Sequence, residues 1–240
     1  MRYKSFFCLL VLTSSSVLAS GFDIGRGGDV VYCKDSEANE LRGYYTLDFV
    51  AARTPNNSMI VPGGNWQGSR TRLLALLQER DSHLYRSFKT FLHYYDRRGD
   101  LTLSRRWEGI SNITDHEGGL VDIRDEHLDE NQLPENCVIQ IGQTKNVIQA
   151  VIRKVNLDTC TIYYTYDKDL FLALETARPL QFSFLMVHEW LRDLTDDPAT
   201  IRAVNMFLHS AQLEGTNGHD FREVLHDLGL RIGSDAGFCF

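Results

Sequence analysis

The sequence lacks several features that would each define a class of protein. After residue 19 it contains no run of about 18 apolar residues, the length that a membrane-spanning helix needs. It has no Cys-x-x-Cys pair, no Gly-x-Ser-x-Gly elbow and no internal repeat. Lys and Arg number 25 against 32 Asp and Glu, and the resulting net charge of −7 argues against a protein that neutralises duplex phosphates. We therefore expect no transmembrane anchor and no nucleic-acid partner.

The composition is that of a folded globular chain. Apolar residues make up 43%, charged residues 24% and aromatic residues 11% of the 240 positions. These proportions exclude disorder, collagen and coiled coil as descriptions of the whole chain. The length is sufficient for one domain with a full core, so we predict a single domain over residues 20–240.

The first 19 residues have the organisation of a secretory signal peptide. Arg2 and Lys4 form a positive start, residues 6–12 are apolar, and Val17-Leu18-Ala19 supplies the small residues that a signal peptidase reads. The alternative is a buried N-terminal strand or helix. Cleavage after Ala19 would leave 221 residues and, by removing the two basic residues, change the net charge from −7 to −9. We expect a periplasmic or secreted protein, with a protein or another envelope component as its unknown partner.

Export changes the interpretation of the cysteines. Loss of the signal peptide would remove Cys8 and leave an even number of cysteines in an oxidising compartment. The four disulfide candidates allow three pairings, among which the sequence does not choose: Cys33, Cys137, Cys160 and Cys239.

Hydrophobic patterning predicts an α+β fold in which a small antiparallel sheet is packed by helices and the C-terminal third is helical. Expected strands are Asp29–Cys33, Val138–Ile141, Val147–Ile152 and Thr161–Tyr166, the last three as a meander. Expected helices are Leu47–Arg53, one long helix over Ser69–Tyr95, Lys168–Ala177, Leu180–Leu194, Pro198–Gln212 and Asp220–Leu228. The seven acids between Asp115 and Glu130 lack the order of a calcium loop and indicate a solvated face.

One pattern has chemical content. Residues 182–194 place His188 and Glu189 on an apolar helix, which is how zinc peptidases position a metal ligand and a general base. Such a peptidase requires a second histidine four residues later. That position holds Arg192, whose fixed positive charge would repel a metal ion.

The following helix could complete a cluster. Asp197 is suited to the N-cap and Pro198 to the first turn, and the short connection should fold this helix back on the preceding one. Its polar stripe then faces the His–Glu pair with three residues: Arg202, Asn205 and His209.

Two hypotheses follow from this cluster. In the first, His188 and His209 bind zinc and Glu189 activates water, which would make the chain a zincin-like metal-dependent hydrolase. In the second, which we favour, the protein is non-catalytic: Glu189 pairs with Arg192 or Arg202, while Asn205 and the histidines satisfy buried polar groups.

The chain resembles a family of uncharacterised exported bacterial proteins. The resemblance rests on short motifs along most of the mature chain: Gly27-Gly28-Asp29-Val30-Val31-Tyr32-Cys33, Leu47-Asp48 leading to Ala52-Arg53, Leu133-Pro134 before Cys137, and His188-Glu189-Trp190 followed by Arg202. This sequence has Ala51 where the family has glutamate. The resemblance implies an exported bacterial protein and no established activity.

Overall fold

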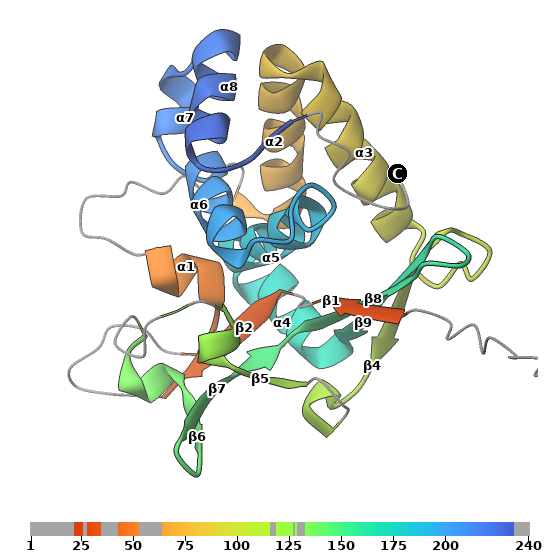
Figure 1. Ribbon diagram of the computed structural model, residues 1–240, viewed down its shortest axis with the longest axis vertical. Helices are drawn as coiled ribbons and strands as arrows, with labels where there is room; N and C mark the ends of the chain where they lie inside the picture. The colour runs from red at the N-terminus through yellow and green to blue at the C-terminus, as the bar shows by residue number, and fades with distance from the viewer. Residues whose placement is uncertain are drawn as a thin grey trace, which may run out of the picture.

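A computed structural model describes residues 22–25, 28–34, 43–52, 64–115, 119–126, 128 and 133–232. Within these ranges the chain forms two β-sheets beneath a layer of helices (Figure 1). The α+β class and the helical C-terminal third are thus confirmed. The predicted signal peptide, Met1–Ala19, lies outside the described residues, and the single-domain organisation stays a prediction.

The first sheet has the strand order β1-β8-β9-β4. Neighbouring strands are antiparallel except for β9 and β4, which run parallel. The strands are β1 (Phe22–Gly25), β8 (Val151–Asn156), β9 (Thr161–Asp167) and β4 (Arg105–Ile110).

The second sheet is antiparallel throughout and has the order β3-β2-β7-β5, with β6 also paired to β7. Its strands are β3 (Gly43–Thr46), β2 (Asp29–Cys33), β7 (Thr144–Gln149), β5 (Leu120–Asp122) and β6 (Ile139–Ile141). Three short 3-10 helices lie nearby: η2 (Ile113–Asp115), η3 (Ile123–Glu126) and η4 (Glu135–Cys137).

The predicted three-stranded meander is wrong. The strand predicted over Val147–Ile152 is divided at Ala150, where the chain leaves β7 in one sheet and enters β8 in the other. Ala150 is completely buried, its amide donates to the Gly28 carbonyl oxygen (2.9 Å), and its own carbonyl accepts from the Asp167 amide (3.2 Å). Its backbone groups are therefore satisfied at the crossing between the sheets.

The helices cover the sheets and one another. In Figure 1, α5 and α6 occupy the centre, between the sheets and the group formed by α2, α3 and α8. The helices are α1 (Leu47–Ala52), α2 (Trp66–Arg80), α3 (Ser82–Asp96), α4 (Lys168–Ala177), α5 (Pro179–Leu191), α6 (Pro198–Leu208), α7 (Gln212–Gly215) and α8 (Gly218–Asp227). None of the helices among the described residues has the length and apolar character needed to cross a membrane.

The single long helix expected over Ser69–Tyr95 is also wrong, because the chain breaks at Asp81. The Asp81 side chain accepts the His83 and Leu84 amides (2.9 and 3.0 Å) and so caps a new helix, α3. Asp81 has extended backbone angles, which end α2 at Arg80. Aspartate is a favoured N-cap, and its capping outweighs the helical periodicity that continues across this point.

Two hydrophobic clusters hold the layers together. The larger lies between the helices and the first sheet, where Trp107 stacks on Tyr164 with ring centroids 4.2 Å apart. The smaller surrounds the disulfide between Cys33 and Cys137. Of the other two disulfide candidates, Cys160 is also disulfide-bonded, and Cys239 lies outside the described residues.

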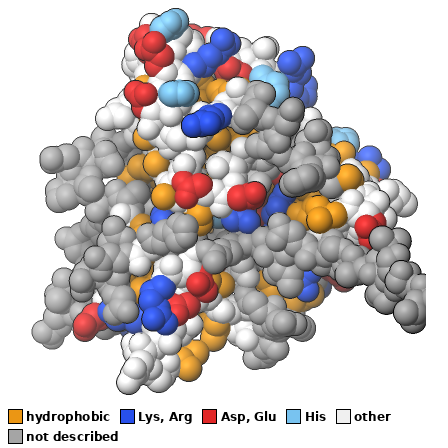
Figure 2. Space-filling model, viewed as in Figure 1, with side chains coloured by type: hydrophobic (Ala, Val, Ile, Leu, Met, Phe, Trp, Pro, Cys, Tyr) orange, Lys and Arg blue, Asp and Glu red, His pale blue; other side chains and the backbone are white. Residues whose placement is uncertain are grey.

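The described surface carries charges of both signs. On the face in Figure 2, basic and acidic side chains are interspersed with hydrophobic ones. Within the predicted acidic segment, Asp122 pairs with its neighbour Arg124 (2.6 Å). Other residues of that segment lie outside the described ranges.

Candidate functional site

The His–Glu pair lies in the buried part of helix α5. Pro179 begins α5, and every residue from Gln181 to Leu191 is buried. The helix is apolar almost all round, so it is stable only when covered on all sides. Each polar side chain that it carries must therefore find a partner inside the protein.

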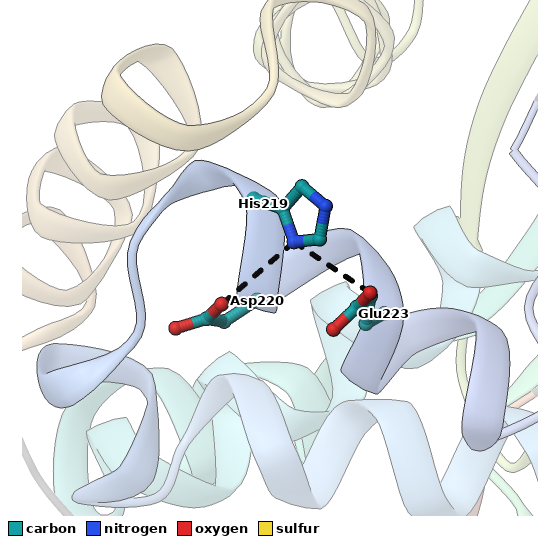
Figure 3. Close-up of side chains that lie close together, drawn as sticks. All are labelled: His219, Asp220 and Glu223. Atoms are coloured by element: carbon teal, nitrogen blue, oxygen red, sulfur yellow. Dashed lines mark ion pairs between the residues drawn. The ribbon is translucent and has the colours of Figure 1, made fainter.

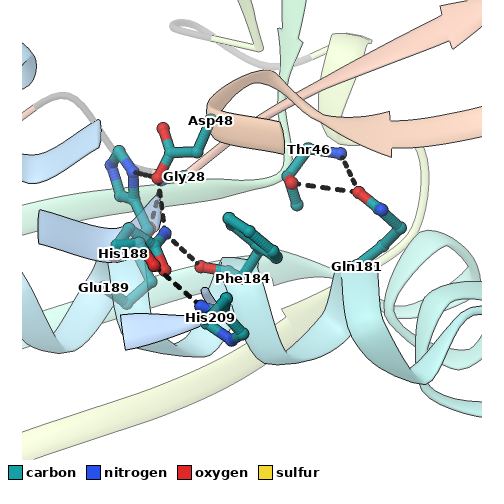
Figure 4. A network of polar contacts seen from close by, with 9 residues as sticks. Gly28, Thr46, Asp48, Gln181, Phe184, His188, Glu189 and His209 are labelled. Carbon is teal, nitrogen blue, oxygen red and sulfur yellow. Dashed lines mark hydrogen bonds and ion pairs between the residues drawn. The ribbon is translucent and has the colours of Figure 1, made fainter. Parts of the chain in front are cut away.

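Gln181 is the first of these polar residues. Its side-chain oxygen accepts from both the amide and the hydroxyl group of Thr46 (2.9 and 3.1 Å), which attaches the start of α5 to the end of β3 (Figure 4).

His188 pairs with an acid that the sequence pattern did not indicate, Asp48 on α1. His188 Nδ1 lies 2.9 Å from Asp48 Oδ2, and Asn205 Nδ2 donates to the same oxygen (2.6 Å) and to the Phe184 carbonyl oxygen (2.8 Å). All of these side chains are buried, and Figure 4 shows Asp48 and His188 approaching each other from different helices. The network therefore joins α1, α5 and α6.

The electrostatics of this pair favour charge on both members. Burial opposes the ionisation of Asp48, but the His188 charge and hydrogen bond, with help from Asn205 and Arg202, lower the pKa of Asp48. Burial likewise favours a neutral His188, but the Asp48 carboxylate and, more weakly, Glu189 raise the pKa of His188. Both shifts favour the imidazolium–carboxylate form of this buried pair.

Glu189 holds the backbone that leads into β2. Its Oε1 accepts the amide of Gly28, 161 residues earlier, and the side chain is entirely buried. Burial raises the pKa of Glu189, against the opposing effects of His188, the Gly28 amide, Arg192 and Arg153. Oε2 forms no hydrogen bond with the described part of the chain.

A side chain at position 28 would displace the groups that surround it. A Cβ at position 28 would lie 2.3 Å from Leu185 Cδ1 and 2.8 Å from Glu189 Oε1, closer than real Cβ contacts. Gly28→Ala is therefore expected to lower the free energy of unfolding by about 1–3 kcal/mol, as overpacking does, in urea denaturation.

The matched control for that substitution is Gly215→Ala. Gly215 ends α7, and a Cβ there would meet nothing within 4 Å. Equal stability losses in the two variants would contradict a close approach at Gly28.

His209 is engaged elsewhere, with both ring nitrogens occupied. Burial lowers its pKa to about 4, so the imidazole is neutral at pH 7 and carries a single N–H. Nδ1 lies 2.9 Å from the Asn205 carbonyl oxygen, which can only accept, so Nδ1 carries the proton. Nε2 then accepts from the Ser183 hydroxyl (2.8 Å), and the ring stacks on Phe184.

The two arginines of the predicted cluster lie beside the acids. Both are buried; the Arg192 charge acts on His188 and Glu189, and that of Arg202 acts on Asp48. His188, Glu189, Arg192, Arg202 and Asn205 thus share one buried region, in which Glu189 accepts its hydrogen bond from the Gly28 amide.

A second charged network follows directly after α5. Asp193 accepts from Arg105 on β4 and from Arg153 on β8 (3.4 Å), and the Tyr164 hydroxyl lies 3.4 Å away. Burial, with Asp193 adding to its effect, raises the pKa of Tyr164. These contacts attach the end of α5 to the first sheet.

The geometry does not assemble the predicted zinc ligands. With Nδ1 of His188 directed to Asp48, only Nε2 could bind a metal, and both nitrogens of His209 are used. Among the described residues, the group with three possible ligand atoms within 4.8 Å of one another is elsewhere: His219, Asp220 and Glu223, exposed at the start of α8 (Figure 3). The positive end of the α8 dipole disfavours a cation there.

Sequence reasoning missed three partners of the cluster: Gly28, Asp48 and Ser183. Asp48 is 140 residues from His188, and Gly28 contributes only backbone. The sequence feature that could have indicated Asp48 is an acid on an otherwise apolar short helix, LDFVAA. The feature that could have indicated Ser183 is a hydroxyl group within the apolar sequence of α5.

The two buried histidines predict opposite pH effects on stability. The pKa of His209 is lowered to about 4, so below pH 6.5 the unfolded chain binds the extra proton and stability falls, by at most about 1.4 kcal/mol per pH unit. The pKa of His188 is raised in the folded protein. Its contribution to the free energy of unfolding is therefore fully present below pH 6.5 and is lost as the pH rises through the folded-state pKa.

Unfolding free energies between pH 4 and 9 test this expectation. His209→Gln should flatten the acid side of the profile and His188→Gln the alkaline side. Both variants retaining the wild-type profile would contradict the assignment.

Comparison with known proteins identifies no relative. The chain matches no protein-family model, no curated protein and no solved structure. The resemblance to exported bacterial proteins stays a prediction, and function is inferred from the site itself.

Proposed function

We propose that the chain is an exported bacterial protein, periplasmic or secreted. We also propose that its His–Glu–Arg cluster is non-catalytic and holds distant parts of the fold together, and we call it the buried joint. The joint consists of two contacts, Glu189 to Gly28 and His188 to Asp48 with Asn205. It fastens α5 and α6 to β2 and α1, elements that are far apart in the sequence.

The observation that carries this proposal is the complete burial of Glu189 with its carboxylate on a backbone amide. A general base must reach the proton that it removes, either directly or through one water molecule. Glu189 has 0% exposure and accepts from Gly28, and His209 is used by Ser183 and the Asn205 carbonyl. These side chains satisfy internal groups, as buried polar residues in a core do.

Export is supported by two features. The residues preceding position 20 have the organisation of a signal peptide. The disulfide between Cys33 and Cys137 joins residues 104 positions apart, and disulfides of this kind form and persist in oxidising compartments. A partner in the envelope or outside the cell follows from this location.

Expression of the full chain in a bacterial host tests export. We expect the protein in the periplasm or medium, with Ser20 as its first residue by intact mass spectrometry. A variant with Leu9→Arg and Leu10→Arg, which interrupts the apolar run, should remain in the cytoplasm with Met1 retained. Full-length wild-type protein confined to the cytoplasm would contradict the proposal.

The alternative function, a zincin-like hydrolase using His188, Glu189 and His209, makes a different prediction. Purified protein would then contain about one zinc ion per chain, lost in His188→Ala, and added zinc would raise its melting temperature. Under the proposal made above, zinc content and melting temperature are the same with and without chelator. Stoichiometric zinc that disappears in His188→Ala would overturn it.

A further inference from the structure

Helix α1 is shared between the buried joint and the disulfide. Leu47 and Val50 belong to the smaller hydrophobic cluster, which contains Cys33 and Cys137. Asp48, between them in sequence, turns to His188 and Asn205 instead. A single six-residue helix therefore contacts both structures.

The helix is too short to hold its position alone. Isolated helices below about 12 residues are marginal in water, so α1 depends on the surfaces that it packs against. One surface is formed by α5 and α6, where Phe49 meets Phe184 edge-on at 5.8 Å. The other is the disulfide cluster.

The disulfide closes that second surface. Cys33 ends β2 and Cys137 ends η4, and the cluster residue Leu133 precedes η4 on the same segment. Among the described residues, hydrogen bonds join this segment to Lys34, which follows β2: the Lys34 amide donates to the Asn136 carbonyl oxygen (2.9 Å), and Asn136 Nδ2 donates to the Lys34 carbonyl oxygen (2.7 Å).

We propose that the oxidation state of the Cys33–Cys137 pair controls the docking of α1 and, through Asp48, the assembly of the buried joint. On oxidation the two thiols lose two protons and two electrons to the disulfide of an exchange partner, which becomes a dithiol. Reduction by a dithiol reverses the step. The oxidised pair fixes the segment 133–137 against β2 and completes the surface that receives Leu47 and Val50.

This coupling is reciprocal, because each contact favours the same position of α1. Oxidation promotes the Asp48–His188 contact, and that contact in turn protects the disulfide, whose cysteines are each only 1% exposed. The inference concerns the purified folded chain, so it can fail while the export proposal stands.

The first test removes the disulfide. In Cys33→Ala/Cys137→Ala, amide exchange across α1 is expected to rise at least tenfold, and the side-chain amide resonance of Asn205 should move. Cys160→Ala is the matched control, since that residue is disulfide-bonded elsewhere. Unchanged α1 exchange in the folded double variant would overturn the coupling.

The second test needs no cysteine variant, so it remains decisive if the double variant does not fold. Wild type, Asp48→Asn and Asp81→Asn are treated with dithiothreitol, and reduced Cys33 and Cys137 are counted by alkylation and mass spectrometry. Asp81 caps α3 and pairs with Arg222, so Asp81→Asn shows how a loss of global stability alone changes the reduction rate. The unfolding rate of each protein is measured alongside, and its reduction rate is divided by that unfolding rate.

We expect this ratio to be at least tenfold higher in Asp48→Asn than in wild type and Asp81→Asn. Equal ratios in the three proteins would overturn the proposal.

Discussion

Replacing Glu189 with alanine is expected to lower the free energy of unfolding by about 3 kcal/mol or more. The substitution leaves the buried Gly28 amide without its acceptor, which costs about 1–3 kcal/mol. It also removes the Glu189 carboxyl group from beside Arg153 and Arg192. Removing one member of a buried charged pair lowers the free energy of unfolding further, because the other charge stays buried without its partner. The measurement is equilibrium urea unfolding at pH 7.

The matched control is Glu223→Ala on α8. Its side chain is 68% exposed and contacts only His219 at 3.6 Å among the described ion pairs, so its removal should change stability by less than about 0.5 kcal/mol. Unfolding curves for Glu189→Ala that superimpose on wild type would show that the buried carboxylate does not stabilise the fold.

Asp48→Ala is expected to cost about 3–5 kcal/mol at pH 6.5, the range for breaking a buried ion pair. The substitution leaves His188 buried without its carboxylate and removes one of the two acceptors of Asn205 Nδ2. Asp48→Asn should cost less, because a neutral oxygen can still accept from His188. Urea unfolding of both variants measures the order.

Asp227→Ala is the control for that series. Asp227 ends α8, its side chain is 85% exposed, and its neighbour His226 lies 3.8 Å away. If Asp48→Ala were as stable as Asp227→Ala, the joint between α1 and α5 would contribute nothing to folding.

Much of the helical part could be predicted because its boundaries are encoded locally. Residues 168–177 form α4 as expected, and the Asp167 side chain caps it by accepting the Asp169 and Leu170 amides. Pro198 begins α6 behind the N-cap Asp197, also as expected. In both places the capping side chain and the apolar periodicity point to the same boundary.

Two boundaries differ from the prediction because the residue pattern continues on both sides of each. Apolar periodicity continues past Asp81, and β-branched residues lie on both sides of Ala150, at 147–148 and 151–152. At Asp81 the helix is interrupted by hydrogen bonds from nearby backbone amides to the Asp81 side chain. At Ala150 the backbone bonds instead to Gly28 and Asp167, which are distant in the sequence. Asp48 is likewise distant in sequence from His188, and the helices that carry these two residues meet only in the folded protein.

The Gly28 amide provides the most direct test of the buried joint. Its acceptor, Glu189, is completely buried, and the Gly28 carbonyl is held by the Ala150 amide. We predict that hydrogen exchange at this amide requires global unfolding, with a protection free energy equal to the unfolding free energy of the whole protein. In Glu189→Gln the protection should fall. Rapid exchange of the Gly28 amide in the folded wild-type protein would contradict the joint.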